Sequence, residues 1–235
     1  MLAALLLPAL ASARQKSHRV ACLFNLRQTG IAVYLYSQDN DGRIPYGPLA
    51  PPFTSPANFY PSTGSPTSLL SLQSGAPVGL GLLLKDYVAQ QPKIFFCPGA
   101  DQRVDADAEL AKVSEAQAQG SYFYRHGGVT QLFYTPSEPV PHLILDDLGT
   151  NRIGRPIRAL AVDSLFLSPP SLVPFGVKTR THHQRQAVGV LFADGHASSL
   201  LNTTNRFTVD VTNYADLYDA FNRILRVLEG ADEEP

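Results

Sequence analysis

The first 42 residues follow a helical pattern of apolar and polar positions, and the rest of the chain is organised around them. Residues 1–13 carry no charge, and a basic cluster from Arg14 to Arg19 follows directly. From residue 20 onward, apolar side chains recur at helical spacing, which is typical of an amphipathic helix. We expect one face to hold Val20, Leu23, Arg27, Gly30, Ile31 and Tyr34, and its apolar stripe to be widened by Cys22, Leu26 and Val33.

This pattern ends in Gln-Asp-Asn-Asp-Gly at residues 38–42, which suits a helix C-cap, and Pro45 follows soon after. A helix of about 38 residues between Leu2 and Gly42 would be roughly 57 Å long at about 1.5 Å per residue. A globular fold of 235 residues rarely needs so long a helix. We therefore expect the apolar tip to pack in lipid or against like helices, through Leu2, Leu5, Leu6, Leu7, Pro8 and Leu10.

The second half of the chain has the short alternating patterns of an antiparallel sheet. Asp194-Gly195 lies between two apolar runs, 187–192 and 196–201, and predicts a hairpin turn. At the C-terminus, apolar residues at spacings of three and four predict an amphipathic helix over 213–229, with Asn213 and Gly230 as caps. The remaining expected strands are 121–124, 129–134, 143–145 and 159–166.

Between the first helix and these strands the chain is less regular. Residues 47–78 are rich in proline, which excludes a helix or a central strand and predicts a surface excursion. We expect a short helix over 78–90, an extended segment over 93–98 and an exposed helix over 101–119. The fold class is thus α+β: a long N-terminal helix (1–42) and a head (43–235) with an antiparallel sheet, long loops and a C-terminal helix.

Composition narrows the function classes. The net charge of −1 gives no electrostatic surface for nucleic acid, so we expect no nucleic-acid partner. Thirteen uncharged residues fall short of the roughly 20 that span a bilayer. The basic cluster that follows them suits a position beside a membrane as well as a solvated helix face.

Two cysteines, Cys22 and Cys97, are too few for a disulfide scaffold. If the head lies outside the cytoplasm, they could form a bridge, which would stabilise the fold by roughly 4 kcal/mol. The alternative is a pair of buried free thiols. The sequence leaves both open.

Four polar residues near the predicted hairpin form the candidate site: His182, His183, Asp194 and His196, with Asp163 as a further member. Imidazole and carboxylate are ligands of Zn²⁺ and other divalent metals. The spacing matches no metal motif, so a polar loop of hydrogen bonds is the other interpretation. Asp39 to Gly42 does not begin a calcium loop, because position 48 is Pro instead of Glu. No nucleophile motif is present, and we expect neither an enzyme nor a cofactor other than such a metal.

Four stretches carry a resemblance to a known family. They are LAALLLPALASARQKSHRVACLFNLRQTGIAVYLYSQDNDGRIP (2–45), KIFFCPGAD (93–101), RALAVDS (158–164) and AVGVLFADGHASSL (187–200). Together they resemble type IV prepilin-like and type II secretion pseudopilin-like proteins. The similarity is greatest to a bacterial subgroup with a prepilin-type cleavage and methylation N-terminus and a C-terminal His-x9-Asp-Gly motif.

The resemblance implies a pilin-like fold and a structural, non-catalytic subunit of a type II secretion or type IV pilus-like assembly. Its partners would be copies of itself and related pseudopilins, bound through the N-terminal helix, together with prepilin peptidase and the assembly machinery. Its location would be the bacterial inner membrane, crossed once, with the head outside the cytoplasm, at the cell surface or in a filament.

Two departures from the family affect these expectations. The family's basic leader, cleavage site, methylated Phe and Glu-bearing segment are missing, and Met1 precedes what would be the middle of the apolar segment. We expect a full-length form that begins upstream; the other interpretation is a paralogue that no longer enters filaments. Ten residues separate His183 from Asp194, where the subgroup has nine.

Two other functions compete with the structural subunit. One is a secreted or surface-anchored module that binds carbohydrate or another envelope component through its long loops. The other is a metal-dependent hydrolase built on the His and Asp cluster.

Overall fold

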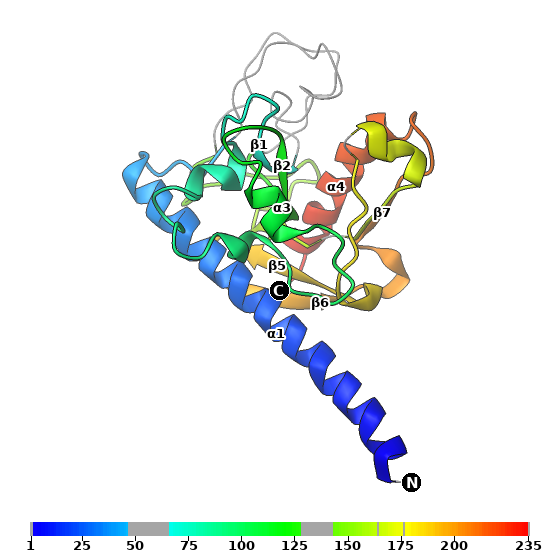
Figure 1. The fold of residues 1–235 in the computed structure, drawn as a ribbon. Helices are drawn as coiled ribbons and strands as arrows, with labels where there is room; N and C mark the ends of the chain where they lie inside the picture. Colours follow the sequence, from blue (N-terminus) through cyan, green and yellow to red (C-terminus); the bar gives the residue numbers. More distant parts are fainter. Residues whose placement is uncertain (1, 47–65, 128–142, 164, 176, 235) are drawn as a thin grey trace.

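The computed structural model describes residues 2–46, 66–127, 143–163, 165–175 and 177–234. In these residues the protein has an α+β fold, in which a long N-terminal helix contacts a five-stranded antiparallel sheet and a second helix ends the chain (Figure 1). The predicted fold class is confirmed.

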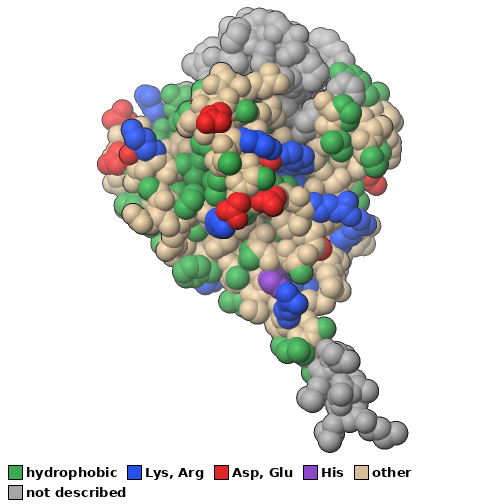
Figure 2. All heavy atoms as spheres, in the orientation of Figure 1, with side chains coloured by type: hydrophobic (Ala, Val, Ile, Leu, Met, Phe, Trp, Pro, Cys, Tyr) green, Lys and Arg blue, Asp and Glu red, His purple; other side chains and the backbone are tan. Residues whose placement is uncertain are grey.

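The long helix α1 spans Leu2–Asp39 without a break. It ends where the sequence predicts, because Asp41 and Gly42 adopt the left-handed region (φ 54° and 76°) and the Gly42 N–H donates to the Ser37 carbonyl at 2.8 Å. Its N-terminal part projects from the head (Figures 1 and 2), and Leu10 is 69% exposed. The apolar tip therefore does not fold back into the protein's own core.

Only part of the predicted apolar face of α1 packs on the head: Cys22, Leu26, Gly30 and Val33 are buried. Val20, Ile31 and Tyr34 are 66%, 53% and 54% exposed, whereas the flanking set with Cys22 and Leu26 is buried. The spacing alone could not choose between the two sides, because α1 carries apolar residues on both.

Close approach at Gly30 fixes the docked side. A Cβ there would lie 2.9 Å from Leu191 Cδ1 and 3.4 Å from Gly195 Cα, so a larger residue would require the end of the Leu191 side chain to move. The buried members of the docked stripe are Cys22, Leu26, Thr29, Gly30, Val33 and Tyr36.

The five strands lie in the order β1-β2-β3-β5-β6, and every neighbouring pair is antiparallel. The predicted hairpin is confirmed: β5 and β6 pair from Ala187↔Leu201 to Leu191↔Ala197, and Gly195 turns with φ 85°. The strand bounds are β1 Thr67–Ser71, β2 Ala118–Tyr124, β3 Ala159–Val162, β5 Ala187–Phe192 and β6 Ala197–Leu201. Two further strands, β4 Leu165–Leu167 and β7 Thr208–Asp210, form a parallel pair.

The sheet buries side chains on both faces. On β5, Leu191 belongs to the core beneath α1, whereas Val188 and Val190 belong to the core beneath the C-terminal helix α4. This follows from the alternation of side chains along a strand. The two helices thus cover opposite faces of the sheet (Figure 1).

Several predicted elements need correction. Residues 159–166 are not one strand: β3 ends before Asp163, whose carboxylate accepts the Gly189 N–H, and β4 continues in the other sheet. Residues 67–71, expected in a surface excursion, form the buried edge strand β1. The C-terminal helix α4 spans Leu217–Asp232 instead of 213–229, because Asn213 Oδ1 accepts the N–H groups of residues 215 and 216 in a preceding turn. Gly230 lies inside α4.

The expected helices in the middle of the chain are mostly short 3₁₀ turns. Only α3 Ala106–Leu110 is helical within 101–119, and 143–145 form isolated bridges instead of a strand. The expected strand 129–134 and the excursion up to residue 65 lie outside the described residues. The 3₁₀ turns are η2 Gly79–Leu83, η3 Pro92–Phe95, η4 Pro170–Phe175, η5 His183–Arg185 and η6 Thr203–Asn205.

A helix that crosses a bilayer needs roughly 20 predominantly apolar residues. Among the described residues, no helix combines the length and the apolar character needed to cross a bilayer.

Candidate metal centre

Four buried polar side chains meet between α1 and the sheet: Cys22, Cys97, Asp163 and His183. One ligand atom from each lies within 4.8 Å of those of the other three. Each residue is less than a tenth exposed. Within the described ranges this is the one group of three or more His, Cys, Asp or Glu residues with such geometry. We call it the cysteine cluster.

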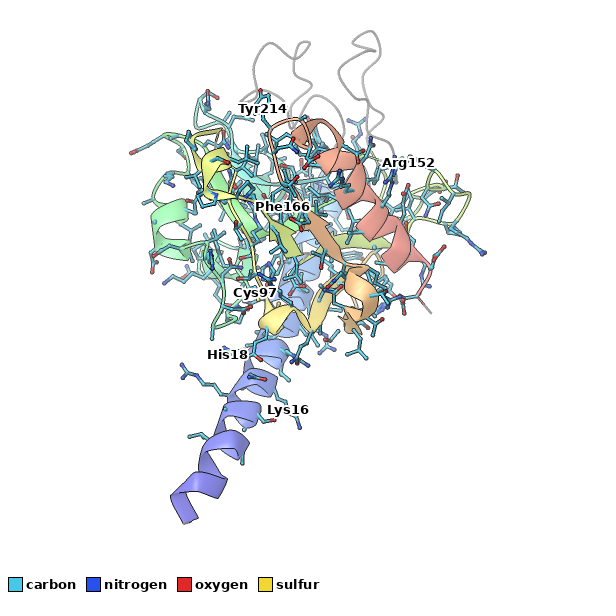
Figure 3. All side chains as sticks on the ribbon, turned by 90° about the vertical axis from the view of Figure 1, so that its right-hand side faces the viewer. Lys16, His18, Cys97, Arg152, Phe166 and Tyr214 are labelled. Atoms are coloured by element: carbon cyan, nitrogen blue, oxygen red, sulfur yellow. The ribbon has the colours of Figure 1, made fainter. Side chains whose placement is uncertain are left out.

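Each member comes from a different part of the fold. Cys22 lies on α1, Cys97 follows η3, Asp163 follows β3, and His183 begins η5. Figure 3 shows Cys97 in the lower part of the head, near the point where α1 emerges from it. The cysteine cluster therefore joins the long helix to three segments of the head.

Asp163 is the centre of the cluster's hydrogen bonds. Its Oδ2 lies 3.2 Å from Cys22 Sγ and 3.2 Å from His183 Nε2, and Cys97 Sγ lies 3.6 Å from the same Nε2. The other oxygen, Oδ1, accepts the Gly189 N–H at 2.5 Å. One carboxylate oxygen is thus held by the backbone, and the other is directed at the Cys22 sulfur and the imidazole.

These contacts change the acidities of the cluster. A hydrogen bond with Cys97, burial and the charge of Asp163 raise the pKa of the Cys22 thiol well above its ordinary value. Burial alone would lower the pKa of His183, but its hydrogen bonds to Asp163 and Cys22 and the Asp163 charge raise it to about 10. These pKa shifts favour the imidazolium form of His183 and the thiol form of Cys22 at neutral pH.

The backbone around the cluster is constrained. His183, Gln184 and Arg185 all have positive φ (47°, 54° and 62°), a region that costs a non-glycine residue of order 1 kcal/mol or more. Asp101 holds this turn: its Oδ2 accepts the Gln184 N–H at 3.0 Å, and its carbonyl accepts the Thr181 hydroxyl. The strained turn is what directs His183 at the cysteines.

Glycine in β5 makes room for the cluster. A Cβ at Gly189 would lie 2.8 Å from Leu26 Cδ1, 3.3 Å from Asp163 Oδ2 and 3.6 Å from Cys22 Sγ. A larger residue at this position would crowd Leu26 of α1 and the Asp163 carboxylate, and would touch the Cys22 sulfur.

The structure separates the residues predicted for a metal site. His183 joins the cluster, whereas Asp194 and His196 pair with each other at the hairpin turn, with 2.5 Å between Oδ1 and Nδ1. His196 also stacks on Phe192, with ring centroids 4.3 Å apart. His182 is buried, its Nδ1 lies 3.1 Å from Gln102 Nε2, and burial lowers its pKa to about 4.

The structure also bears on the predicted bridge between the cysteines and on the residues predicted for assembly. Both cysteines are free and buried, so the structure has the pair of thiols and not the bridge. Of the residues assigned to assembly, Leu10 is exposed, and the side chains up to Pro8 lie outside the described ones.

The sequence points to the four cluster members as two separate groups. Asp163 and His183 belong to the predicted metal site, whereas Cys22 and Cys97 are predicted only as a pair of cysteines. Positions 22, 97, 163 and 183 match no metal motif, because the site forms from segments far apart in the chain.

Comparisons of the chain with protein-family models, with curated proteins and with solved structures found no match. The fold itself, a long N-terminal helix packed on an antiparallel sheet, is compatible with a pilin-like architecture.

Proposed function

We propose that the protein is a structural, non-catalytic subunit of a type II secretion or type IV pilus-like assembly. In this role the N-terminal part of α1 packs with copies of the same chain and with related subunits. The observation that carries the proposal is that α1 has two unlike parts, an arm outside the head and a segment docked on the sheet (Figure 1).

The arm consists of residues 2–18 and would extend about 26 Å from the head at about 1.5 Å per residue. Arg19 Nη2 donates to Gln186 Oε1 at 2.8 Å, at the point where α1 reaches the head. Because residues 1–13 are uncharged, this part of the arm has no charged face to offer water, and Leu10 is exposed. Such a surface is stabilised by lipid or by like helices.

The docked part of α1 also supports association. Its outer side exposes large apolar side chains at helical spacing on both sides of the exposed Arg27. Exposed apolar surface rimmed by polar residues marks interaction sites in soluble proteins. The exposed side chains are Val20, Phe24, Ile31, Tyr34 and Leu35; we call them the outer stripe.

The basic cluster from Arg14 to Arg19 lies between the arm's apolar tip and the head, where Figure 3 shows Lys16 and His18. In the proposed role these cations lie beside lipid headgroups or in the head layer of a filament. A full-length form would be anchored in the bacterial inner membrane with its head outside the cytoplasm, and prepilin peptidase would process its leader.

Flotation with vesicles of phosphatidylethanolamine and phosphatidylglycerol, together with sedimentation velocity, tests the proposal. We expect the chain to float or to self-associate, and Leu6→Glu/Leu10→Glu to remain monomeric and unbound. The control Gln73→Glu/Gln90→Glu adds the same charge at exposed positions of the head and should behave like the parent chain. A parent chain that is monomeric and stays with the aqueous phase would contradict the proposal and favour a surface binding module.

We do not propose hydrolysis at the cysteine cluster. All four side chains are buried, and a hydrolytic metal site needs a position open to water and substrate.

A further inference from the structure

The geometry points to a structural Zn²⁺ site at Cys22, Cys97, Asp163 and His183, which clamps α1 to the head. The inference is independent of the proposed assembly role, because it concerns the folded chain by itself.

Three of the six distances between the ligand atoms are close to the edges of a zinc tetrahedron, and the other three are within 4.8 Å. With Zn–S of about 2.3 Å and Zn–N and Zn–O of about 2.0 Å, the edges are about 3.5 Å for S···N and S···O and about 3.3 Å for N···O. The corresponding distances are 3.6 Å (Cys97 Sγ to His183 Nε2), 3.2 Å (Cys22 Sγ to Asp163 Oδ2) and 3.2 Å (His183 Nε2 to Asp163 Oδ2). Small shifts of these side chains would complete the site.

The types of ligand atom in the cluster favour Zn²⁺ over hard divalent cations. Two thiolates and an imidazole bind Zn²⁺ in preference to the hard cations Mg²⁺ and Ca²⁺, and a carboxylate completes four ligands. Four protein ligands leave no open coordination position, which is the arrangement of a structural site.

Neighbouring groups already orient the ligands, as the surroundings of a metal site must. The Gly189 N–H holds Asp163 Oδ1, so Oδ2 can bind as a single donor. The Tyr122 hydroxyl lies 3.5 Å from Cys22 Sγ, where it can donate to the thiolate. The positive-φ turn that presents His183 is held by Asp101.

Metal binding needs no oxidant. Zn²⁺ displaces the two thiol protons and the Nε2 proton of His183 to the buffer, and forms one bond each to Sγ of Cys22, Sγ of Cys97, Nε2 and Oδ2. Cys22 lies near the point where the arm leaves the head. The metal–ligand bonds would therefore hold α1 to the head at the position where a force on the arm is transmitted to the head.

Metal titration of the full chain tests the inference. The chain is reduced, stripped with a chelator and titrated first with Co²⁺ and then with Zn²⁺. We expect one equivalent of Co²⁺ to give the absorption spectrum of tetrahedral, thiolate-ligated cobalt, and Zn²⁺ to remove it. Zinc should also protect both cysteines from alkylation in the folded chain.

Two pairs of variants separate this site from other binding. His183→Ala should weaken Zn²⁺ binding by more than about 100-fold, because even the loss of a supporting contact costs about 10–100-fold. His196→Ala, at the exposed hairpin turn, should leave binding unchanged. Cys97→Ser should weaken the thiolate-to-cobalt absorption, because Cys22 is then the one thiolate ligand left in the cluster, and Ser199→Ala, at an exposed position of β6, should leave the absorption unchanged.

Three results would overturn the inference. The first is a stripped, reduced parent chain that takes up neither Co²⁺ nor Zn²⁺. The second is binding that survives both His183→Ala and Cys97→Ser, which would mark adventitious sites. The third is a protein purified without reductant whose Cys22 and Cys97 are joined in a disulfide that excludes the metal. Because the parent chain decides the first and third results, the inference stays testable if a variant fails to fold.

Discussion

The two long helices cover opposite faces of the same sheet, but they are built differently. On α4, the apolar residues Phe221, Ile224 and Leu228 are buried against the sheet. On α1, Leu26 is buried while Phe24 and Ile31 remain exposed on the other side. Among the described side chains, α4 buries its apolar side against the sheet, whereas α1 has a second apolar side that remains exposed.

The polar anchors of the two helices also differ. On α4, Asp232 accepts hydrogen bonds from Arg125, from Asn151 and from the N–H groups of Arg158 and Ala159, at 2.8–3.1 Å. On α1, Cys22 belongs to the cysteine cluster, whose members would release protons when they bind the proposed metal ion. The ion pair between Arg125 and Asp232 holds α4 without any ligand, whereas the proposed anchor of α1 requires a bound metal ion.

The largest effect on stability is expected at the α4 anchor. Asp232→Asn leaves the buried Arg125 guanidinium without its counter-ion and should lower the free energy of unfolding by about 3–5 kcal/mol. Urea unfolding measures this. Asp86→Asn, at an exposed position, is the control and should stay within about 0.5 kcal/mol of the parent. A loss at Asp232 as small as that of the control would show that the pair does not hold α4.

Substitutions on the two sides of α1 should have different effects: one should lower the stability of the fold, and the other should weaken self-association. Leu26→Ala removes a fully buried side chain and should cost about 2–5 kcal/mol in the same unfolding assay. Phe24→Ala should cost less than about 0.5 kcal/mol and instead weaken self-association in sedimentation velocity. If Phe24→Ala destabilises the monomer as much as Leu26→Ala does, the outer stripe is part of the fold and the comparison fails.

Removing zinc should weaken the α1 side alone. At a free Zn²⁺ concentration about 100 times the Kd, the metal would add about 2.7 kcal/mol, which a chelator should abolish. Hydrogen exchange should then increase around Cys22 and Cys97 and stay unchanged in α4. His183→Ala should show no difference with and without chelator. Equal loss of protection in both helices would argue against a local clamp.

The smallest effect concerns the acid stability of the head. Burial would raise the pKa of Glu109, but hydrogen bonds from Lys112, Lys178 and the Gln119 N–H lower it overall. A lowered folded pKa means that Glu109 stabilises the fold above its unfolded pKa of about 4.3, and that this contribution is lost as pH falls through the folded value. Glu109→Gln should therefore lose less stability than the parent between about pH 5 and pH 2 in acid titrations. An unchanged acid slope would contradict the assignment.

The sequence predicted the parts of the fold whose patterns are local and one-sided. The β5–β6 hairpin follows from Asp194-Gly195 between two apolar runs, and α4 follows from one clean apolar face. The docked side of α1 could not be predicted, because apolar residues lie on both sides and the choice depends on the close approach at Gly30.

The cysteine cluster was beyond prediction for a different reason. Its members meet only because β3 and β5 are neighbours in the sheet and α1 crosses near them, which is non-local information. The strand β3 also ends before Asp163, whereas the sequence pattern predicts one strand over 159–166. The histidines predicted together were instead divided between two ends of β5.

Photo-cross-linking tests most directly the claim that α1 has a second partner surface and α4 does not. A photoreactive residue is placed at Ile31, on the outer stripe, and in a separate chain at Arg226, on the exposed side of α4. The account predicts covalent dimers from Ile31 and none from Arg226 at the same protein concentration. Dimers from neither position, or equally from both, would contradict it.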